Sequence, residues 1–255
     1  MALREFLSDK QVFTAHDFAQ TFPDSQTDRN LLTRAVQRGG VDRVRRGLYV
    51  SKSGPFARAH ADPFDVASAA VPDAVFCLLS ALQLHGVSHN VVNKVQFYTR
   101  QHIAPFEYDG IAYEPHRLAD HHLKIQSIFT RTARMYHVTT KEQTLVDGLT
   151  HVSIAGGPEH LLRSLAGFIV IDIPSILALA DSAALSVNAR LGWVLDTKHD
   201  DWNVAEDILV SVRQHIGSGP YYFWSSTPPK DGHWVKRWRL YLPYPEQEMD
   251  SWLNL

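Results

Sequence analysis

The chain has 255 residues, of which 45% are hydrophobic and 20% are charged, and its formal net charge is −2. This composition is typical of a globular protein and argues against a disordered or low-complexity chain. The single cysteine, Cys77, excludes an intramolecular disulfide and fits a reducing compartment.

No membrane-spanning segment is expected. The most apolar stretch, residues 161–180, contains Arg163, Asp172 and Pro174, which is typical of two buried helices rather than of a membrane span. The first ten residues carry charges every few positions and lack the apolar core of a signal peptide. We therefore expect a cytoplasmic protein with no membrane partner.

The charge is distributed unevenly along the chain. Residues 1–60 hold ten Lys and Arg against six Asp and Glu, a net charge of +4, and the remaining residues carry −6. A small basic end on an acidic body is typical of proteins that bind nucleic acid at one end. The sequence therefore predicts a nucleic-acid-binding region within the first sixty residues.

Two helices are expected between residues 14 and 38. Thr14 is suited to cap the first, and Pro23 ends it at Phe22. The second ends before Gly39 and Gly40. Its face opposite the apolar stripe carries side chains that can bond to bases or phosphates, namely Gln26, Arg29, Asn30, Thr33, Arg34 and Gln37.

The next ten residues, VDRVRRGLYV, predict a basic hairpin. Gly47 supplies the positive φ that a tight turn needs. The inward-pointing residues of its two short strands are expected to be Val41, Val44, Leu48 and Val50. Three arginines remain, Arg43, Arg45 and Arg46, and the last two are expected at the exposed tip.

Two helices followed by a basic hairpin are the elements of a winged helix-turn-helix, in their usual order. In that arrangement the second helix enters the major groove, and the hairpin contacts phosphates or the adjacent minor groove. The alternative is a small helical subdomain that contacts protein and whose charges are solvated.

The rest of the chain predicts an α+β body. Four runs rich in β-branched and aromatic residues are expected to form strands, at residues 94–100, 111–117, 124–131 and 133–139, and helices precede and follow them. The predicted fold class is α+β, with an N-terminal winged helix-turn-helix over residues 1–56 and a larger mixed α/β domain over residues 57–255.

Metal and catalytic sites were weighed and set aside. His85 and His89 are four residues apart, and His121 and His122 are adjacent, but no third ligand stands out for either pair. The sequence 196–198, Asp-Thr-Lys, resembles a nuclease pattern but follows a predicted helix and lacks an upstream acid. We therefore expect no metal, no cofactor and no catalytic residue. The alternative is a nucleic-acid-processing enzyme that uses the winged helix for targeting.

An aromatic and basic run near the C-terminus, residues 234–241, predicts a continuous strand. Alternation places Trp234, Lys236, Trp238 and Leu240 on one face and Val235, Arg237, Arg239 and Tyr241 on the other. This is either an ordinary sheet with a basic outer face or a contact surface for nucleic acid or a protein partner.

Four stretches in order resemble the AbiEi family of bacterial antitoxins. In VDRVRRGLYV a basic run precedes Gly, a hydrophobic residue and Tyr, as in the family's wing, where the match covers Arg43, Arg45, Arg46 and Tyr49. The other stretches are PDAVFCLLSALQLHGVS, TTKEQTLVDGL and NARLGWVLD, and the resemblance extends from about Phe13 to about Pro243.

This resemblance implies a non-enzymatic protein of a type IV toxin–antitoxin system. The winged helix would bind double-stranded DNA at inverted repeats in the promoter of its own operon and repress transcription. The C-terminal domain would counteract a cognate nucleotidyltransferase-like toxin. Tyr49 either contacts DNA or packs the wing onto the helices, and packing is the favoured role.

Overall fold

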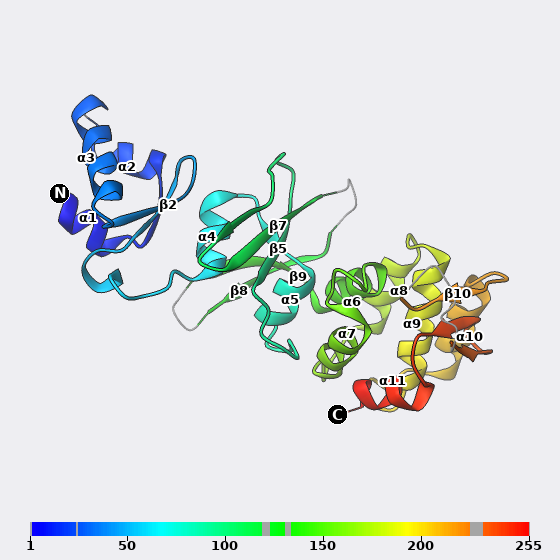
Figure 1. The fold of residues 1–255 in the computed structure, drawn as a ribbon. Coiled ribbons are helices and arrows are strands. Elements are labelled where there is room, and N and C mark those ends of the chain that lie inside the picture. Colours follow the sequence, from blue (N-terminus) through cyan, green and yellow to red (C-terminus); the bar gives the residue numbers. More distant parts are fainter. Residues whose placement is uncertain (1, 24, 119–122, 131–133, 225–231, 255) are drawn as a thin grey trace. The chain divides into compact units, whose positions relative to one another are not determined.

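The fold is mixed α+β, as predicted (Figure 1). The structure is a computed structural model that describes residues 2–23, 25–118, 123–130, 134–224 and 232–254, and for residues 25–29 it describes the backbone alone. Contacts between Cα atoms divide the chain into two compact units. Unit 1 comprises Met1–Ala74 and Asn93–Ala119, and unit 2 comprises Val75–Val92 and Asp120–Leu255. No helix among the described residues combines the length and the hydrophobicity needed to cross a bilayer.

Unit 1 begins with three helices and a small sheet. The elements are α1 (Leu3–Asp9), β1 (Val12–Thr14), α2 (Ala15–Thr21), α3 (Ser25–Gln37), β2 (Val41–Arg45) and β3 (Leu48–Ser51). The three strands form an antiparallel sheet in the order β1-β3-β2. Apolar side chains from the helices and strands share one core, in which the Phe6 ring meets the rings of Phe13 and Phe18 edge to face at 5.1 and 5.6 Å.

The rest of unit 1 is a short 3-10 helix, one α-helix and three strands. They are η1 (Gly54–Phe56), α4 (Pro63–Ala70), β5 (Lys94–Thr99), β6 (Phe106–Tyr108) and β7 (Ile111–Arg117). Strand β7 pairs with β6 in antiparallel and with β5 in parallel. Unit 1 therefore contains all of residues 1–56 together with later elements. A separate domain ending at residue 56 stays a prediction.

Unit 2 contains most of the helices. Its first elements are β4 (Val75–Phe76), α5 (Leu78–Leu84), β8 (Ile125–Phe129), β9 (Met135–Thr139), α6 (Lys141–Thr150) and α7 (Gly157–Ala166). They are followed by α8 (Ile173–Ala180), α9 (Leu185–Thr197), α10 (Glu206–His215), β10 (Tyr221–Tyr222), β11 (His233–Val235), β12 (Leu240–Leu242) and α11 (Glu246–Leu253). Strand β9 pairs with β8 in antiparallel and with β4 in parallel. The four predicted strand runs therefore correspond to β5, β7, β8 and β9.

Helix α9 lies at the centre of the unit 2 core because it is buried along most of its length. Gly192 on this helix packs against the Trp238 ring so closely that a Cβ atom would collide with the ring. Trp238 itself is fully buried. The glycine therefore sets how near the C-terminal segment can approach α9.

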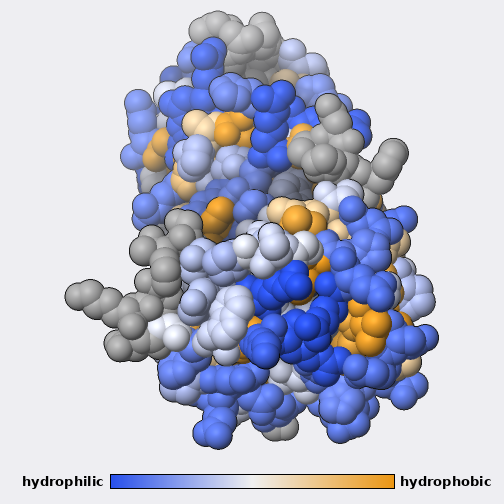
Figure 2. All heavy atoms as spheres, turned by 90° about the vertical axis from the view of Figure 1, so that its right-hand side faces the viewer, coloured by the Kyte–Doolittle hydropathy of each residue, from blue (hydrophilic) through white to orange (hydrophobic). Residues whose placement is uncertain are grey.

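The C-terminal segment differs from its prediction. Residues 234–241 are not one strand, because a turn over residues 236–239 separates β11 from β12 and Arg239 adopts a φ of 51°. The turn breaks the alternation, so Val235 is buried while Trp234 is 45% exposed. The face of the molecule shown in Figure 2 is largely hydrophilic, with small separate hydrophobic areas rather than one apolar surface.

Candidate nucleic-acid interface

The helix pair α2–α3 is fixed at its start by a reciprocal cap. The Thr14 side chain accepts a hydrogen bond from the Asp17 backbone N–H at 3.1 Å, and the Asp17 carboxylate accepts one from the Thr14 N–H at 2.7 Å. Burial alone would raise the pKa of Asp17, but the hydrogen bonds from Lys10 and Thr14 outweigh it and lower this pKa to about 2. The predicted cap at Thr14 is confirmed.

Helix α3 separates an apolar side from a polar side. Leu32 is buried, and Ala35 and Val36 pack against the core that it belongs to. The polar candidates whose side chains the structure describes are all exposed on the helix, namely Asn30, Thr33, Arg34 and Gln37. Their spacing of three and four residues places them on one side of the helix. Gln26 and Arg29 lie on the same helix, but their side chains are outside the described part of the structure.

The hairpin of β2 and β3 contains a bulge that the alternation of its sequence does not reveal. Arg43 pairs with Tyr49 and Arg45 pairs with Leu48, so Val44 is an extra residue in β2. Tyr49 and Leu48 are neighbours on β3 and point to opposite faces of the sheet. Their partners Arg43 and Arg45 therefore also point to opposite faces, although they are two residues apart.

Arg43 lies on the sheet face that carries Tyr49. The Tyr49 ring stacks on Phe13 with 5.7 Å between ring centroids, which confirms that Tyr49 packs the hairpin onto the helices. Arg43 itself is exposed. Of the four residues expected to point inward, Val41, Leu48 and Val50 are buried, while Val44 is only half-buried because it is the bulged residue.

Arg45 departs from the expected position at an exposed tip. It is half-buried, and its guanidinium carbon lies 5.1 Å from the centre of the Phe106 ring of β6. The bulge causes this change, because it directs Arg45 towards β6. Its Nη1 atom is buried and has no hydrogen-bond partner among the described residues. A role for Arg45 in binding DNA stays a prediction.

A second contact joins the hairpin to β6. The Tyr108 hydroxyl donates a hydrogen bond of 3.0 Å to the Asp42 carboxylate, and the ammonium group of Lys52 lies 3.9 Å from the same carboxylate. Burial, followed by the charge and hydrogen bonding of Asp42, raises the pKa of Tyr108. These contacts hold the negative charge of Asp42 away from the hairpin tip.

A polar cavity lies beside the hairpin tip. It has a volume of about 240 Å³, and its polar lining side chains are Thr14, Arg45, Arg46, Gln101 and His102. Gln101 and His102 belong to the connection between β5 and β6, and His102 is exposed. Two guanidinium groups and an imidazole therefore surround one small polar space, which is suited to a phosphate.

Asp73 positions this connection. Its carboxylate accepts hydrogen bonds from the Thr99 hydroxyl at 2.9 Å, the Arg100 backbone N–H at 3.0 Å and the Gln101 side chain at 2.8 Å. Burial alone would raise the pKa of Asp73, but these bonds lower it overall. The sequence analysis missed Gln101 and His102. The polar run TRQH between two strands was the available signal, but nothing local links it to a hairpin some fifty residues earlier.

The rejected sites are occupied by structural interactions. Asp196 accepts hydrogen bonds from Arg237 at 3.0 Å and from the Trp238 indole at 2.8 Å. Lys198 is buried, and its ammonium group pairs with Asp201. Within the described ranges, no three His, Cys, Asp or Glu side chains are grouped so that they could hold a metal ion. His121 and His122 lie outside the described residues.

Both histidines of the pair at residues 85 and 89 also have structural surroundings. The His85 Nε2 atom lies 2.8 Å from the Thr139 carbonyl oxygen, and burial lowers the pKa of His85. The His89 backbone N–H donates to the Ser164 hydroxyl at 3.0 Å. These two rings therefore do not form the zinc-binding pair whose spacing they share.

The stretches that carry the family resemblance in unit 2 also have structural roles. The Arg190 guanidinium donates to the carbonyl oxygens of Leu149 at 2.6 Å and Tyr222 at 2.9 Å. Thr140 caps α6 through the Gln143 N–H at 3.3 Å. These residues explain how unit 2 is held together, and they do not by themselves assign a surface for a toxin.

Comparison with solved structures shows a shared fold. The crystal structure of the RV2827C protein from Mycobacterium tuberculosis matches with a TM-score of 0.70 over 93% of this chain and 88% of that chain, at 14% sequence identity. At this identity the likeness concerns the fold alone. No family model matches the sequence, and no curated protein does.

Proposed function

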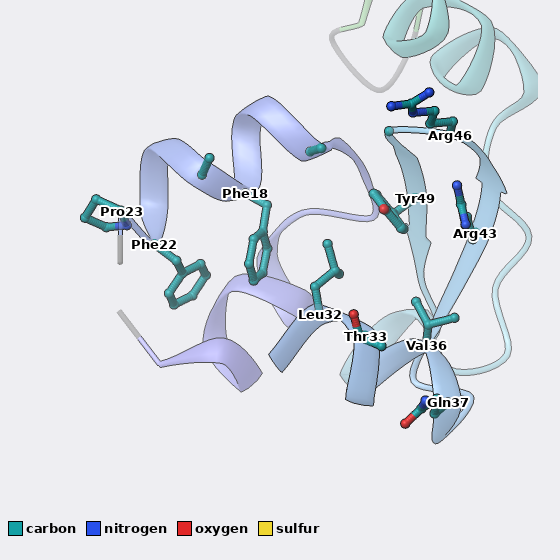
Figure 3. Close-up of a pocket in the computed structure, with 13 residues that line it drawn as sticks. Phe18, Phe22, Pro23, Leu32, Thr33, Val36, Gln37, Arg43, Arg46 and Tyr49 are labelled. Atoms are coloured by element: carbon teal, nitrogen blue, oxygen red, sulfur yellow. The ribbon is translucent and has the colours of Figure 1, made fainter. Parts of the chain in front are cut away.

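We propose that the N-terminal part of unit 1 is a winged helix that binds double-stranded DNA. The observation that carries this proposal is the convergence of two elements on one surface. Thr33 and Gln37 of α3 and Arg43 and Arg46 of the hairpin line the same hollow (Figure 3). The polar side of the helix and the basic hairpin therefore face the same ligand, as duplex binding requires.

The chemistry of this surface suits the two parts of a duplex. Asn30, Thr33, Arg34 and Gln37 are exposed on the helix that would enter the major groove, where amide and guanidinium groups read base edges. Arg43 and Arg46 would contact phosphates, which position the protein and make its affinity depend on salt. Gln26 and Arg29 are included through their place on α3, and Arg45 through the polar cavity beside the hairpin tip.

The polar cavity extends this phosphate contact. Arg46 borders both the hollow next to α3 and the polar cavity, and His102 approaches from the connection between β5 and β6. A DNA backbone that follows the hairpin would therefore meet Gln101 and His102 after Arg46. Protonated His102 would strengthen that contact as the pH falls below about 6.5.

We further propose that the protein is an antitoxin of a type IV system that represses its own operon. It would bind inverted repeats in its promoter and counteract a cognate nucleotidyltransferase-like toxin. This part rests on the resemblance of four ordered stretches to the AbiEi family. The shared fold with the mycobacterial protein extends over almost the whole chain and is compatible with it.

A reporter assay tests the repressor role. The promoter region upstream of the gene is fused to a reporter and measured with and without the protein. Repression that is lost when either inverted repeat is scrambled supports the proposal, and unchanged reporter output contradicts it. Co-expression with a neighbouring nucleotidyltransferase-like gene tests the antitoxin role: the protein should restore growth, and continued growth arrest contradicts that role.

A further inference from the structure

A second, larger hollow lies between α2, α3 and the hairpin. It has a volume of about 660 Å³, which is within the range of cavities that hold small molecules (Figure 3). All its lining residues belong to unit 1, and they come from three elements that are separate in the sequence. In Figure 3 the side chains of Phe18 and Leu32 point into the space between the two helices and the hairpin.

The floor of this hollow is apolar. Phe18 and Leu32 are buried beneath it, and Phe22, Val36 and Tyr49 are partly buried around them. On α2 the lining residues one turn apart are Ala15 and Ala19, both exposed. Two small side chains at positions i and i+4 leave open a space that larger residues would have closed.

The rim of the hollow is positively charged. Arg43 and Arg46 line it, both are exposed, and neither has an ion-pair or hydrogen-bond partner among the side chains that the structure describes. The acids on neighbouring elements are engaged elsewhere: Asp17 pairs with Lys10, and Asp42 accepts from Tyr108. An apolar floor beneath two uncompensated guanidinium groups is complementary to a molecule with an apolar body and an anionic head.

We infer that this hollow binds a small amphipathic anion, an aliphatic or aromatic carboxylate, whose head is held by Arg43 and Arg46. Because Thr33, Gln37, Arg43 and Arg46 also belong to the proposed DNA surface, the bound anion and the duplex exclude each other. The anion then acts as an inducer that releases the repressor from its operator. This regulatory part rests on the proposed function, whereas binding of the anion does not.

The binding test uses the full chain and two probes. Octanoate is titrated by calorimetry, and it is also used to displace the fluorescent aromatic sulfonate 1-anilinonaphthalene-8-sulfonate. We expect saturable octanoate binding, and we expect Arg43→Ala and Arg46→Ala each to weaken it roughly tenfold. Octylamine has the same chain with a cationic head and should not bind.

Two further variants separate the hollow from other apolar surfaces. Ala19→Leu fills the hollow from an exposed helical position that tolerates leucine, so it should abolish octanoate binding while the protein stays folded. Arg4→Ala removes an exposed arginine of α1 that does not line the hollow, and it should leave binding unchanged. Octanoate binding that is absent in the unmodified protein, or that is insensitive to Ala19→Leu and to both arginine substitutions, overturns the site.

The competition is tested with a fluorescent operator duplex. Octanoate should raise the apparent dissociation constant for DNA in the unmodified protein and have no effect in Ala19→Leu. An unchanged DNA affinity at saturating octanoate overturns the inducer role. A protein that binds octanoate but no duplex overturns the proposed DNA-binding function and leaves the anion site standing, so the two failures are distinguishable.

Discussion

Arginine side chains serve different purposes in the two units. In unit 2, Arg190 donates to two backbone carbonyl oxygens and Arg237 pairs with Asp196 and Glu206. In unit 1, Arg43 and Arg46 are exposed and have no partner among the described side chains. A charge that the fold satisfies internally stabilises the fold, whereas a charge left unsatisfied on a surface is available to a ligand.

Arg45 is intermediate between these two groups. It stacks on Phe106, as a structural arginine would, but its buried Nη1 atom has no hydrogen-bond partner among the described residues. A phosphate in the adjacent polar cavity would satisfy it. Substitutions that remove internally satisfied charges should therefore lower stability, and those that remove exposed charges should lower affinity.

The largest expected effect concerns the best-satisfied arginine. Arg190→Ala removes donors from two carbonyl oxygens inside unit 2 and should lower the free energy of unfolding by about 3 kcal/mol. Denaturation in urea measures this change. The matched control is Arg163→Ala, which breaks only an i,i+4 pair with Glu159 and should cost no more than about 0.5 kcal/mol. Equal effects of the two substitutions would contradict the comparison.

Removing the exposed charges should have the opposite signature. The double substitution of Arg43 and Arg46 by alanine should weaken duplex binding roughly tenfold to a hundredfold at moderate salt. The free energy of unfolding should change by less than about 0.5 kcal/mol, because neither side chain has a described partner. Calorimetric unfolding, together with DNA titration of the same preparation, checks both. A large loss of stability would place these arginines in the structural group.

The cap of α2 gives a smaller effect with a defined pH dependence. Because the pKa of Asp17 in the folded protein is about 2, below its ordinary value of 3.8, its contribution to stability is complete above that ordinary value and is lost as the pH falls towards 2. Asp17→Asn should lower the free energy of unfolding by about 1 kcal/mol at pH 7. Thermal unfolding at several pH values should show the difference from the unmodified protein shrinking between pH 4 and 2. A difference that stays constant with pH would exclude this linkage.

The smallest effect concerns the contact between the hairpin and β6. Tyr108→Phe removes the hydroxyl that donates to Asp42 and leaves the ring in place. We expect the free energy of unfolding to fall by about 0.5–1 kcal/mol. We also expect slightly weaker DNA binding, since the freed carboxylate lies on the same strand as Arg43 and repels phosphate. Stronger DNA binding by this variant would be inconsistent with that role.

The parts of the fold with local signals could be predicted from the sequence. Thr14 and Asp17 lie three residues apart before an apolar face, and Gly39 follows the last helical turn, so the limits of α2 and α3 were predictable to within a residue or two. The four strand runs were predictable because each combines β-branched or aromatic residues with partial alternation. The polar side of α3 follows from the same periodicity.

The parts that were missed depend on distant partners. Nothing in residues 41–50 indicates the bulge at Val44, because it follows from the register with β3 and from Phe106, which is sixty residues further along the chain. The connection that carries His102 is held by Asp73. The turn after Val235 lies next to Trp238, whose position depends on Gly192. Each of these features is a long-range packing choice without a local sequence signal.

The central claim is that α3 and the basic hairpin form a surface that reads duplex DNA. It is tested most directly by fluorescence anisotropy with the DNA upstream of the gene and a shuffled duplex at two salt concentrations. We predict selective binding that weakens with salt, and a salt slope that falls by about 0.9 for each of Arg43 and Arg46 when it is replaced by alanine. Absence of binding to either duplex at low salt would contradict the claim.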